Sequence, residues 1–278
     1  REYSTAIKKY LDNNHAIKVP KEQLVTKPGK VSYLPHHGVK HPRKDLRIVF
    51  DTSMRTDGKS LSTEIYQGPD NLNAMVGVFI RFRQEVIAVI ADIKAFYHAV
   101  RLDPRDEDFH RFFYFNDLYD ASSPVIEYKL RCHLFGGISS QSVANLALFD
   151  TIERSKQTGE LNSDEAELVK KSFYSDDFGR SFGHVPTATR IMLKLIGILA
   201  KHNFELTKFG SNSRSFLEQI PSQARLPWDD DNPIHSVLGI KWNYKLDVLH
   251  NNIADVIQGG PIETKRKLLS SVASVWDP

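Results

Sequence analysis

The chain has 278 residues, of which 41% are hydrophobic and 26% are charged, and it contains one cysteine. A chain of this length buries roughly three quarters of its unfolded surface on folding, which excludes a disordered protein and favours one large domain or two small ones. With Cys132 alone, an internal disulfide and a cysteine-based zinc site are excluded. The longest apolar run, residues 86–91, is far shorter than the ~20 residues of a membrane-spanning helix.

The start of the sequence and the distribution of charge bear on the location and the partners of the protein. The sequence begins at Arg1 without a signal-peptide pattern, which predicts a piece cut from a longer polypeptide. The single cysteine suits a reducing compartment, and we expect an intracellular, cytoplasmic protein with no membrane partner. The net charge of +3 is uneven, because the first 50 residues hold 11 Lys or Arg against 4 Asp or Glu. A basic end is typical of proteins that face a polyanion, but it also occurs in proteins that bind none. Charge alone therefore leaves a nucleic-acid partner open.

The first third of the chain has no internal repeat and predicts only short elements. We expect a helix over residues 4–13, a strand over 46–50 and a helix over 72–84. Four prolines between residues 20 and 42 keep the chain extended there and exclude a long helix.

One histidine cluster, formed by His36, His37 and His41, lies in this proline-rich stretch. Because it has no partner cysteines, added positive charge near nucleic acid is a better interpretation of it than metal binding.

The rest of the chain alternates predicted strands and helices. Residues 86–92 are nearly continuous in β-prone apolar residues, which is typical of a central strand covered on both faces. A helix that starts at Ser139 or Ser140 has apolar residues that do not form one stripe, so we expect burial on more than one side. Further predictions are strands over 109–115, 127–134 and 204–209, a helix over 188–199 and a polar loop over 157–165.

Residues 171–182 have aromatic side chains on both sides of a polar centre, which predicts a β-hairpin with Asp176 and Asp177 at or near its turn. Helices and strands alternate without a strict βαβ rhythm. The predicted fold class is therefore α+β, with one mixed or antiparallel sheet.

Three carboxylates have apolar surroundings in the sequence. Asp92 ends the apolar strand, and Asp176 and Asp177 interrupt the aromatic hairpin. A buried carboxylate is costly unless it is paired, hydrogen-bonded or bound to a metal. If the strand and hairpin are neighbours in one sheet, the three carboxylates form an oxygen-rich site suited to Mg²⁺.

Spacing alone favours the simpler alternative, because an Asp-Asp pair is usually a turn. Residues 229–231, three aspartates between prolines with no apolar strand beside them, serve as a control that we assign to a solvated loop.

Nine short motifs occur in one order along the chain, and together they are more specific than any one of them. They are residues 33–37 (YLPHH), 46–51 (LRIVFD), 68–69 (GP), 81–83 (RFR), 91–97 (ADIKAFY), 135–140 (FGGISS), 173–177 (FYSDD), 204–208 (FELTK) and 238–242 (LGIKW). Through these motifs, residues 33–278 resemble the reverse transcriptases of long-terminal-repeat retrotransposons, most closely the BEL/Pao group.

The resemblance implies a right-hand polymerase fold with fingers and palm subdomains, in which a mostly antiparallel palm sheet is backed by helices and the thumb is mostly missing. The implied subdomains are an N-terminal extension with fingers over residues 1–85, the first catalytic palm strand over 86–103, fingers over 104–130, palm with the catalytic hairpin and closing motifs over 131–250, and a truncated start of the thumb and connection over 251–278.

The resemblance also implies nucleotidyl transfer from a deoxynucleoside triphosphate (dNTP) to a primer 3′-hydroxyl, with two Mg²⁺ ions or with Mn²⁺. Carried over by position, the catalytic residues are Asp92, Asp176 and Asp177, and the metal-binding positions are Asp92, Ile93, Asp176 and Asp177. The implied nucleotide-binding residues are Arg47, Lys44, Tyr97, Gly136 and Lys208, and the primer and template contacts are Tyr174, Ser175, Gly239 and Trp242.

Each implied role has a physical reason and a simpler alternative. The Tyr97 ring would collide with a 2′-hydroxyl, which favours DNA over RNA synthesis; a core tyrosine is the alternative. The Arg47 guanidinium suits triphosphate oxygens, and Lys208 would assist the leaving pyrophosphate as a general acid; both are otherwise surface residues. Gly136 would allow the backbone to approach the nucleotide closely.

Two departures from the family pattern qualify the function. Gln141 stands where the family usually has proline, which would loosen the turn, and the chain stops where relatives continue into the thumb.

The hypotheses are an RNA-directed DNA polymerase that binds an RNA or DNA template with its primer, and a retroelement relic that binds nucleic acid without turnover. An RNA-synthesising polymerase is disfavoured by Tyr97. Other polyprotein regions (protease, ribonuclease H and integrase) are expected beyond this chain, and virus-like particles are a further expected location.

Overall fold

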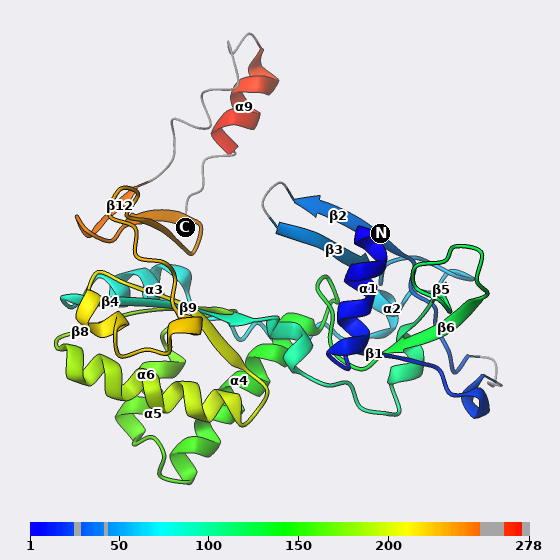
Figure 1. Ribbon diagram of the computed structural model, residues 1–278, viewed down its shortest axis with the longest axis horizontal. Coiled ribbons are helices and arrows are strands. Elements are labelled where there is room, and N and C mark those ends of the chain that lie inside the picture. The colour runs from blue at the N-terminus through cyan, green and yellow to red at the C-terminus, as the bar shows by residue number, and fades with distance from the viewer. Residues whose placement is uncertain (25–28, 42–43, 251–263, 274–278) are drawn as a thin grey trace. The chain divides into compact units, whose positions relative to one another are not determined.

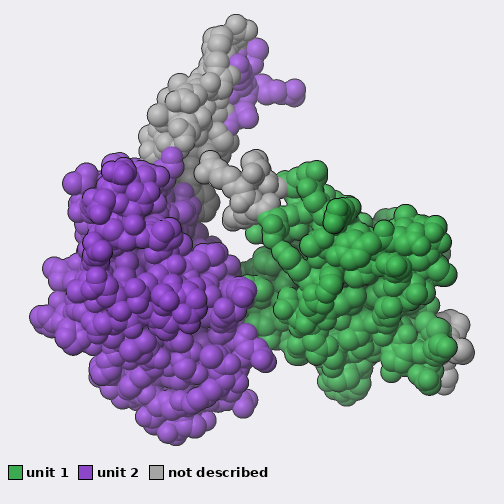
Figure 2. Space-filling model, viewed as in Figure 1, with its two compact units in different colours: residues 1–71, 95–147 green, residues 72–94, 148–278 purple. Residues whose placement is uncertain are grey.

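Two groups of chain segments pack separately in the computed structural model, which describes residues 1–24, 29–41, 44–250 and 264–273 (Figure 1). Unit 1 consists of residues 1–71 and 95–147, and unit 2 of residues 72–94 and 148–278 (Figure 2). The chain therefore passes between the units three times, and each unit is assembled from segments that are distant in the sequence.

These boundaries differ from those of the predicted subdomains. Residues 72–85, expected with the fingers, belong to unit 2, and residues 95–103 and 131–147, expected with the palm, belong to unit 1. Of the predicted thumb segment 251–278, the structure describes only residues 264–273.

Unit 1 contains a three-stranded antiparallel sheet of order β1-β6-β5 and a separate β2-β3 hairpin. Its core joins Ile7 of α1, Phe50 of β3, Phe112 of β5 and Tyr128 of β6. Its elements are α1 (Glu2–Asp12), β1 (Ala16–Lys18), η1 (Lys21–Gln23), β2 (His36–His41), β3 (Lys44–Phe50), α2 (Leu61–Glu64), η2 (Phe96–Ala99), η3 (Glu107–His110), β5 (Arg111–Phe115) and β6 (Val125–Leu130).

A fully buried arginine links three segments of unit 1. The Arg111 guanidinium donates to Asp108 Oδ1 (2.9 Å), to Glu127 Oε2 (2.8 Å) and to the carbonyl oxygen of Gln23 (2.8 Å). Because each of these bonds satisfies a donor removed from water, Arg111 can be buried while it is charged. The network fixes η1 against the β5-β6 pair.

Unit 2 is built on a four-stranded antiparallel sheet of order β7-β8-β4-β9. The apolar strand β4 is central, with α3 on one face of the sheet and α6 on the other (Figure 1). Its elements are α3 (Met75–Phe82), β4 (Ile87–Lys94), α5 (Ser163–Lys170), β7 (Phe173–Tyr174), β8 (Asp177–Phe182), α6 (Val185–Ala200), β9 (Glu205–Ser211), α7 (Arg214–Leu217), η4 (Ser222–Ala224), β10 (Ile234–Val237), β11 (Ile240–Asn243), β12 (Val248–His250) and α9 (Lys265–Ala273), while α4 (Ser140–Gln157) begins in unit 1 and ends in unit 2.

A second small sheet of order β10-β11-β12 packs against α3. The rings of Phe82 and Trp242 meet edge to face at 5.0 Å in this core. Helix α3 therefore buries Val78, Phe79 and Phe82 between the two sheets, while Val76 and Ile80 remain exposed.

The predicted α+β class, the hairpin over 171–182 and the helix over 188–199 are confirmed. The prediction of one mixed or antiparallel sheet is wrong in number, because the strands of the described residues form four separate antiparallel sheets. The three aspartates of 229–231 lie in an exposed loop, as expected. None of the helices in the described ranges combines the length and the hydropathy that crossing a bilayer requires.

Two predictions for the middle of the chain are wrong. Helix α4 buries a single stripe that includes small and polar side chains, whereas Leu146 is exposed. The buried stripe is Ala144, Asn145, Leu148, Thr151, Ile152 and Ser155. The loop expected over 157–165 is shorter, because Asn162 and Glu165 cap each other's backbone N–H groups and start α5.

The histidine cluster also differs from expectation. His36 is half-buried against the edge of the Phe112 ring at 5.3 Å, and burial lowers its pKa. A neutral His36 adds no positive charge. The side chain of His41 lies outside the described residues.

Candidate active site

Two strands of unit 2 place two carboxylates directly opposite each other. In the β4-β8 pairing Asp92 is the partner of Asp177. Directly opposed side chains on an antiparallel pair have Cβ atoms only about 4.5–5.5 Å apart, and like charges there are destabilising. Asp92 and Asp177 therefore require a compensating cation or a bound proton.

The hairpin turn brings the third carboxylate to the same end of the strands. Ser175 has a positive φ of 55°, which is uncommon for a residue with a side chain. The Ile93 N–H donates to the carbonyl oxygen of Asp176 at 2.8 Å, which fixes the turn beside β4. The sequence prediction that Asp176 and Asp177 lie at or near the turn is confirmed.

The electrostatics of this cluster reflect burial and mutual repulsion. Burial, together with the negative charges of Asp176 and Asp92, raises the pKa of Asp177 to about 7. The pKa of Asp176 is also raised, first by burial and then by the charge of Asp92. The charge of Asp92 is thus close enough to affect the ionisation of both Asp176 and Asp177.

A lysine on the neighbouring strand already supplies one positive charge. Lys208 of β9 donates from Nζ to Asp92 Oδ2 at 2.9 Å. Its φ is +54°, and the β4-β9 register shifts between Ile90 and Asp92. This irregular backbone turns Lys208 toward a carboxylate, so it is not an isolated surface lysine.

The predicted metal-binding positions meet the chemical requirements for Mg²⁺ in part. Carboxylate oxygens are the ligands that this ion prefers, and Ile93 could contribute only its carbonyl oxygen. Among the residues that the structure describes, however, no set of three or more His, Cys, Asp and Glu side chains is arranged as a ready metal site. The donor types and the raised pKa values of Asp176 and Asp177 fit a bound cation, while the carboxylates are not preassembled as a cage.

Unit 1 brings together two of the predicted nucleotide-binding residues through a third residue. The Arg47 guanidinium lies 5.3 Å from the centre of the Phe135 ring, within cation–π range. The Phe135 ring meets the Tyr97 ring edge to face at 4.8 Å. Arg47, Phe135 and Tyr97 therefore form one cluster of unit 1.

The other predicted nucleotide-binding residues of unit 1 are less informative. Gly136 has a φ of +83°, and open space surrounds the position of a Cβ there, so backbone conformation is what requires glycine. Lys44 begins β3, but its side chain lies outside the described residues.

The predicted primer and template contacts separate into two groups. Tyr174 and Ser175 belong to the catalytic hairpin, and Gly239, with a φ of +86°, forms the turn between β10 and β11. Trp242 is fully buried, and its indole N–H donates to Asp247 Oδ1 at 2.9 Å. Trp242 is thus a core residue, and its predicted contact with nucleic acid is corrected.

The sequence placed Phe135 in a motif on the nucleotide side and Gln141 directly after it, but it predicted no contact for either side chain. Phe135 contacts both Arg47 and Tyr97, and Gln141 accepts a hydrogen bond from the Tyr97 hydroxyl at 2.6 Å. The available signal was Asn145, a polar residue four positions after Gln141 and hence on the same helix face.

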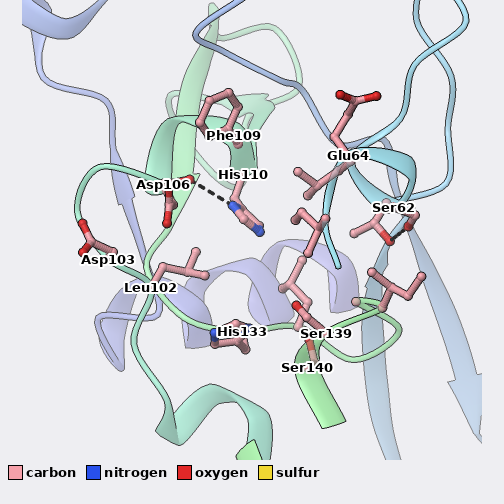
Figure 3. Close-up of a pocket in the computed structure, with 16 residues that line it drawn as sticks. Ser62, Glu64, Leu102, Asp103, Asp106, Phe109, His110, His133, Ser139 and Ser140 are labelled. Carbon is pink, nitrogen blue, oxygen red and sulfur yellow. Dashed lines mark hydrogen bonds between the residues drawn. The ribbon is translucent and has the colours of Figure 1, made fainter. Parts of the chain in front are cut away.

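A cavity of about 390 Å³ in unit 1 is a separate feature (Figure 3). Its lining includes Glu64, Asp103 and Asp106 together with His110 and His133, and it has no lysine or arginine. Burial lowers the pKa of both histidines, so they are neutral near pH 7. An acidic lining without cations does not suit a nucleoside triphosphate.

Solved structures of a foamy viral protease-reverse transcriptase are similar to this chain, whereas its sequence matches no protein-family profile and no curated protein. The dRH form in complex with double-stranded DNA has a TM-score of 0.64 at 14% identity, over 97% of this chain and 39% of that one. A second complex with double-stranded DNA gives 0.64 at 15% identity, over 98% and 46%. The complex with an RNA/DNA hybrid gives 0.61 at 15% identity, over 96% and 29%.

This likeness shows the fold. The chain has the mixed helical and antiparallel-sheet fold of the fingers and palm region of a reverse transcriptase. It spans less than half the length of the proteins it matches.

Proposed function

We propose that the chain is the fingers and palm region of an RNA-directed DNA polymerase, and that its source is a retrotransposon polyprotein of the BEL/Pao group. The observation that carries this proposal is the placement of Asp92 opposite Asp177, with Asp176 in the adjoining turn. A fold-forming role would not require three mutually repelling carboxylates at the end of an apolar strand. The fold of the similar structures supports the same function.

The proposed reaction joins a primer 3′-hydroxyl to the α-phosphorus of a dNTP, with release of pyrophosphate. Two Mg²⁺ ions, held by Asp92, Asp176, Asp177 and the Ile93 carbonyl, would supply activation of the hydroxyl and neutralisation of the phosphates. Lys208, whose Nζ donates to Asp92 in this structure, would stabilise the negative charge of the leaving pyrophosphate.

The residues of unit 1 would select the nucleotide. The N–H groups of the exposed Arg47 guanidinium would bind triphosphate oxygens. Its central carbon, Cζ, would stay 5.3 Å from the centre of the Phe135 ring. The Tyr97 ring would exclude the 2′-hydroxyl of a ribonucleotide. Template and primer would contact the hairpin residues Tyr174 and Ser175 and the turn at Gly239.

A second candidate function is nucleic-acid binding without turnover, as expected of a retroelement relic. The ion pair between Lys208 and Asp92, together with the lack of a preassembled metal cage in the described ranges, favours this alternative. In either case the protease, ribonuclease H and integrase regions would lie on other parts of the polyprotein, in the cytoplasm or in virus-like particles.

Extension of a labelled DNA primer on an RNA template separates the two functions. With Mg²⁺ and dNTPs the wild-type chain should extend the primer, and Asp92→Asn should reduce the rate by roughly 100-fold or more. Asp229→Asn, in the exposed loop, is the matched control and should leave the rate unchanged. Salt-sensitive binding of the duplex without any extension by the wild-type chain would support the relic instead.

Sugar selectivity is tested in the same assay. Tyr97→Ala should admit ribonucleotides that the wild-type chain rejects. Unchanged rejection of ribonucleotides by this variant would remove the steric role of Tyr97.

A further inference from the structure

The Tyr97 hydroxyl is the start of a chain of hydrogen bonds that lies wholly within unit 1. It donates to Gln141 Oε1 at 2.6 Å, Gln141 Nε2 donates to Asn145 Oδ1 at 3.3 Å, and Asn145 Nδ2 donates to the carbonyl oxygen of Asn71 at 3.3 Å. Asn145 is almost completely buried, and Asn71 also donates to the carbonyl oxygen of Ser142 at 2.8 Å. The last two side chains of this hydrogen-bond series, those of Asn145 and Asn71, therefore each donate to a backbone carbonyl oxygen.

The direction of every bond follows from this anchor. A carbonyl oxygen can only accept, so the side chain of Asn145 presents its NH₂ group to Asn71 and its oxygen to Gln141. Gln141 must then donate to Asn145 and presents its own oxygen to Tyr97. The Tyr97 hydroxyl is consequently the donor, and reversal of any amide would place two like groups face to face.

Ring contacts and a hydrogen bond together position the Tyr97 side chain. Phe135 packs against the ring edge to face, the Phe96 ring lies 5.5 Å from it, and Gln141 holds its hydroxyl. Tyr97 is only half-buried and lies on the short helix η2, which follows Ala95 at a φ of +51°. The terminal torsion of a tyrosine side chain has a broad energy well, so a hydrogen bond at the hydroxyl opposes tilting of the ring in a way that ring packing alone does not.

We infer that Gln141 is a positioning residue that fixes the Tyr97 ring and thereby sets the discrimination between deoxyribose and ribose. This inference rests on the proposed function and deepens it. A steric barrier rejects a 2′-hydroxyl only if the ring cannot move aside, so the hydrogen bond contributes to selectivity without contacting substrate. Gln141, expected to loosen the turn, instead stabilises the first turn of α4 against η2.

The test compares Gln141→Met, Tyr97→Phe and the double variant. Each single variant removes the hydrogen bond and keeps the approximate volume and, in Tyr97→Phe, the ring. We expect the ratio of kcat/KM for dNTP over ribonucleotide to fall roughly three- to tenfold in each, the factor of a single hydrogen bond. The double variant should show the same loss as either single variant, because both remove one interaction.

Gln157→Met, at the exposed end of the same helix, is the matched control and should keep the wild-type ratio. A fall in dNTP turnover with an unchanged ratio would indicate general damage to unit 1 and would overturn the inference. A loss of the kcat/KM ratio in the double variant equal to the product of the two single losses would also overturn the inference.

The two levels of the proposal fail differently. A wild-type chain that extends primers, with selectivity that none of the three variants changes, contradicts the positioning role alone. A wild-type chain that incorporates neither kind of nucleotide contradicts the proposed function, and with it this inference.

Discussion

Asp177 shows at the scale of one residue how function and stability oppose each other. Its pKa is raised to about 7 by burial and by the charges of Asp176 and Asp92. An unfolded aspartate titrates at roughly 4, so ionisation of Asp177 in the folded protein lowers stability progressively as the pH rises from about 4 to about 7. A residue that destabilises the fold at neutral pH is expected where a cation is to be bound.

Asp177→Asn should therefore stabilise the protein when divalent cations are absent. In EDTA at pH 8 we expect the free energy of unfolding to rise by about 1–2 kcal/mol, because a buried charge opposed by two others is removed. Millimolar Mg²⁺ should raise the unfolding midpoint of the wild-type chain more than that of the variant. Urea unfolding with and without EDTA measures both effects.

Asp229→Asn is the control, since Asp229 is exposed and an asparagine oxygen can still accept the N–H groups of Asp231 and Asn232. A loss of stability in Asp177→Asn in EDTA would mean that the carboxylate has a structural partner, and the metal assignment would be withdrawn.

The same scale shows which site residues a sequence can reveal. Asp92 and Asp177 stand out because a carboxylate within apolar strand residues has no cheap structural explanation. Gln141 does not, since its partner Tyr97 is 44 positions away and a glutamine at a helix start is ordinary. Trp242 was misassigned because a motif gives its position but not its exposure.

At the scale of elements, unit 1 combines its apolar core with a buried ionic network. Arg111 is fully buried with three oxygen partners, and beside it Lys129 is buried at 2.9 Å from Glu107. Replacement of one member leaves the others unpaired in a medium of low dielectric constant, which is more costly than the loss of the bond itself.

Arg111→Met should lower the free energy of unfolding by about 3–5 kcal/mol, because Asp108 and Glu127 would lose their buried partner. Arg105→Met is the matched control, since that exposed arginine pairs with Asp103 at 2.9 Å in solvent, and it should leave stability unchanged. Thermal unfolding followed by circular dichroism measures the difference. Equal effects of the two substitutions would show that the buried network contributes nothing.

Elements with a simple periodic pattern were predictable, and those held by polar contacts were not. The apolar run of β4 and the spacing of α6 follow directly from burial on the sheet of unit 2. Strand β2 escaped prediction because its sequence, HHGVKH, has neither alternation nor β-branched runs, and it is held by pairing with β3. The buried stripe of α4 was missed because four of its six positions are polar or small.

For the whole molecule, the distribution of buried histidines predicts that acid affects the two units unequally. Burial lowers the pKa of His98 and His133 to about 4, and both belong to unit 1. Burial also lowers the pKa values of three further histidines of unit 1, which are His15, His36 and His110. In unit 2, burial lowers the pKa of His235.

A depressed histidine pKa contributes stability that is present above roughly 6.5, the unfolded value, and is lost as the pH falls toward the folded value of about 4. At pH 5.5, His98 and His133 should each reduce the stability of unit 1 by about 1 kcal/mol relative to pH 7.5. Unit 1 should therefore lose more stability than unit 2 when the pH falls into this range.

The tryptophans make this difference measurable, because Trp228, Trp242 and Trp276 all belong to the chain segments of unit 2. Between pH 7.5 and 5.5 the urea midpoint from far-ultraviolet circular dichroism, which reports both units, should fall by more than the midpoint from tryptophan fluorescence. His98→Gln should reduce the gap, since it removes one group that must be protonated on unfolding. Coincident midpoints at both pH values would mean that the units unfold together, and the three chain crossings between them would then couple their stabilities.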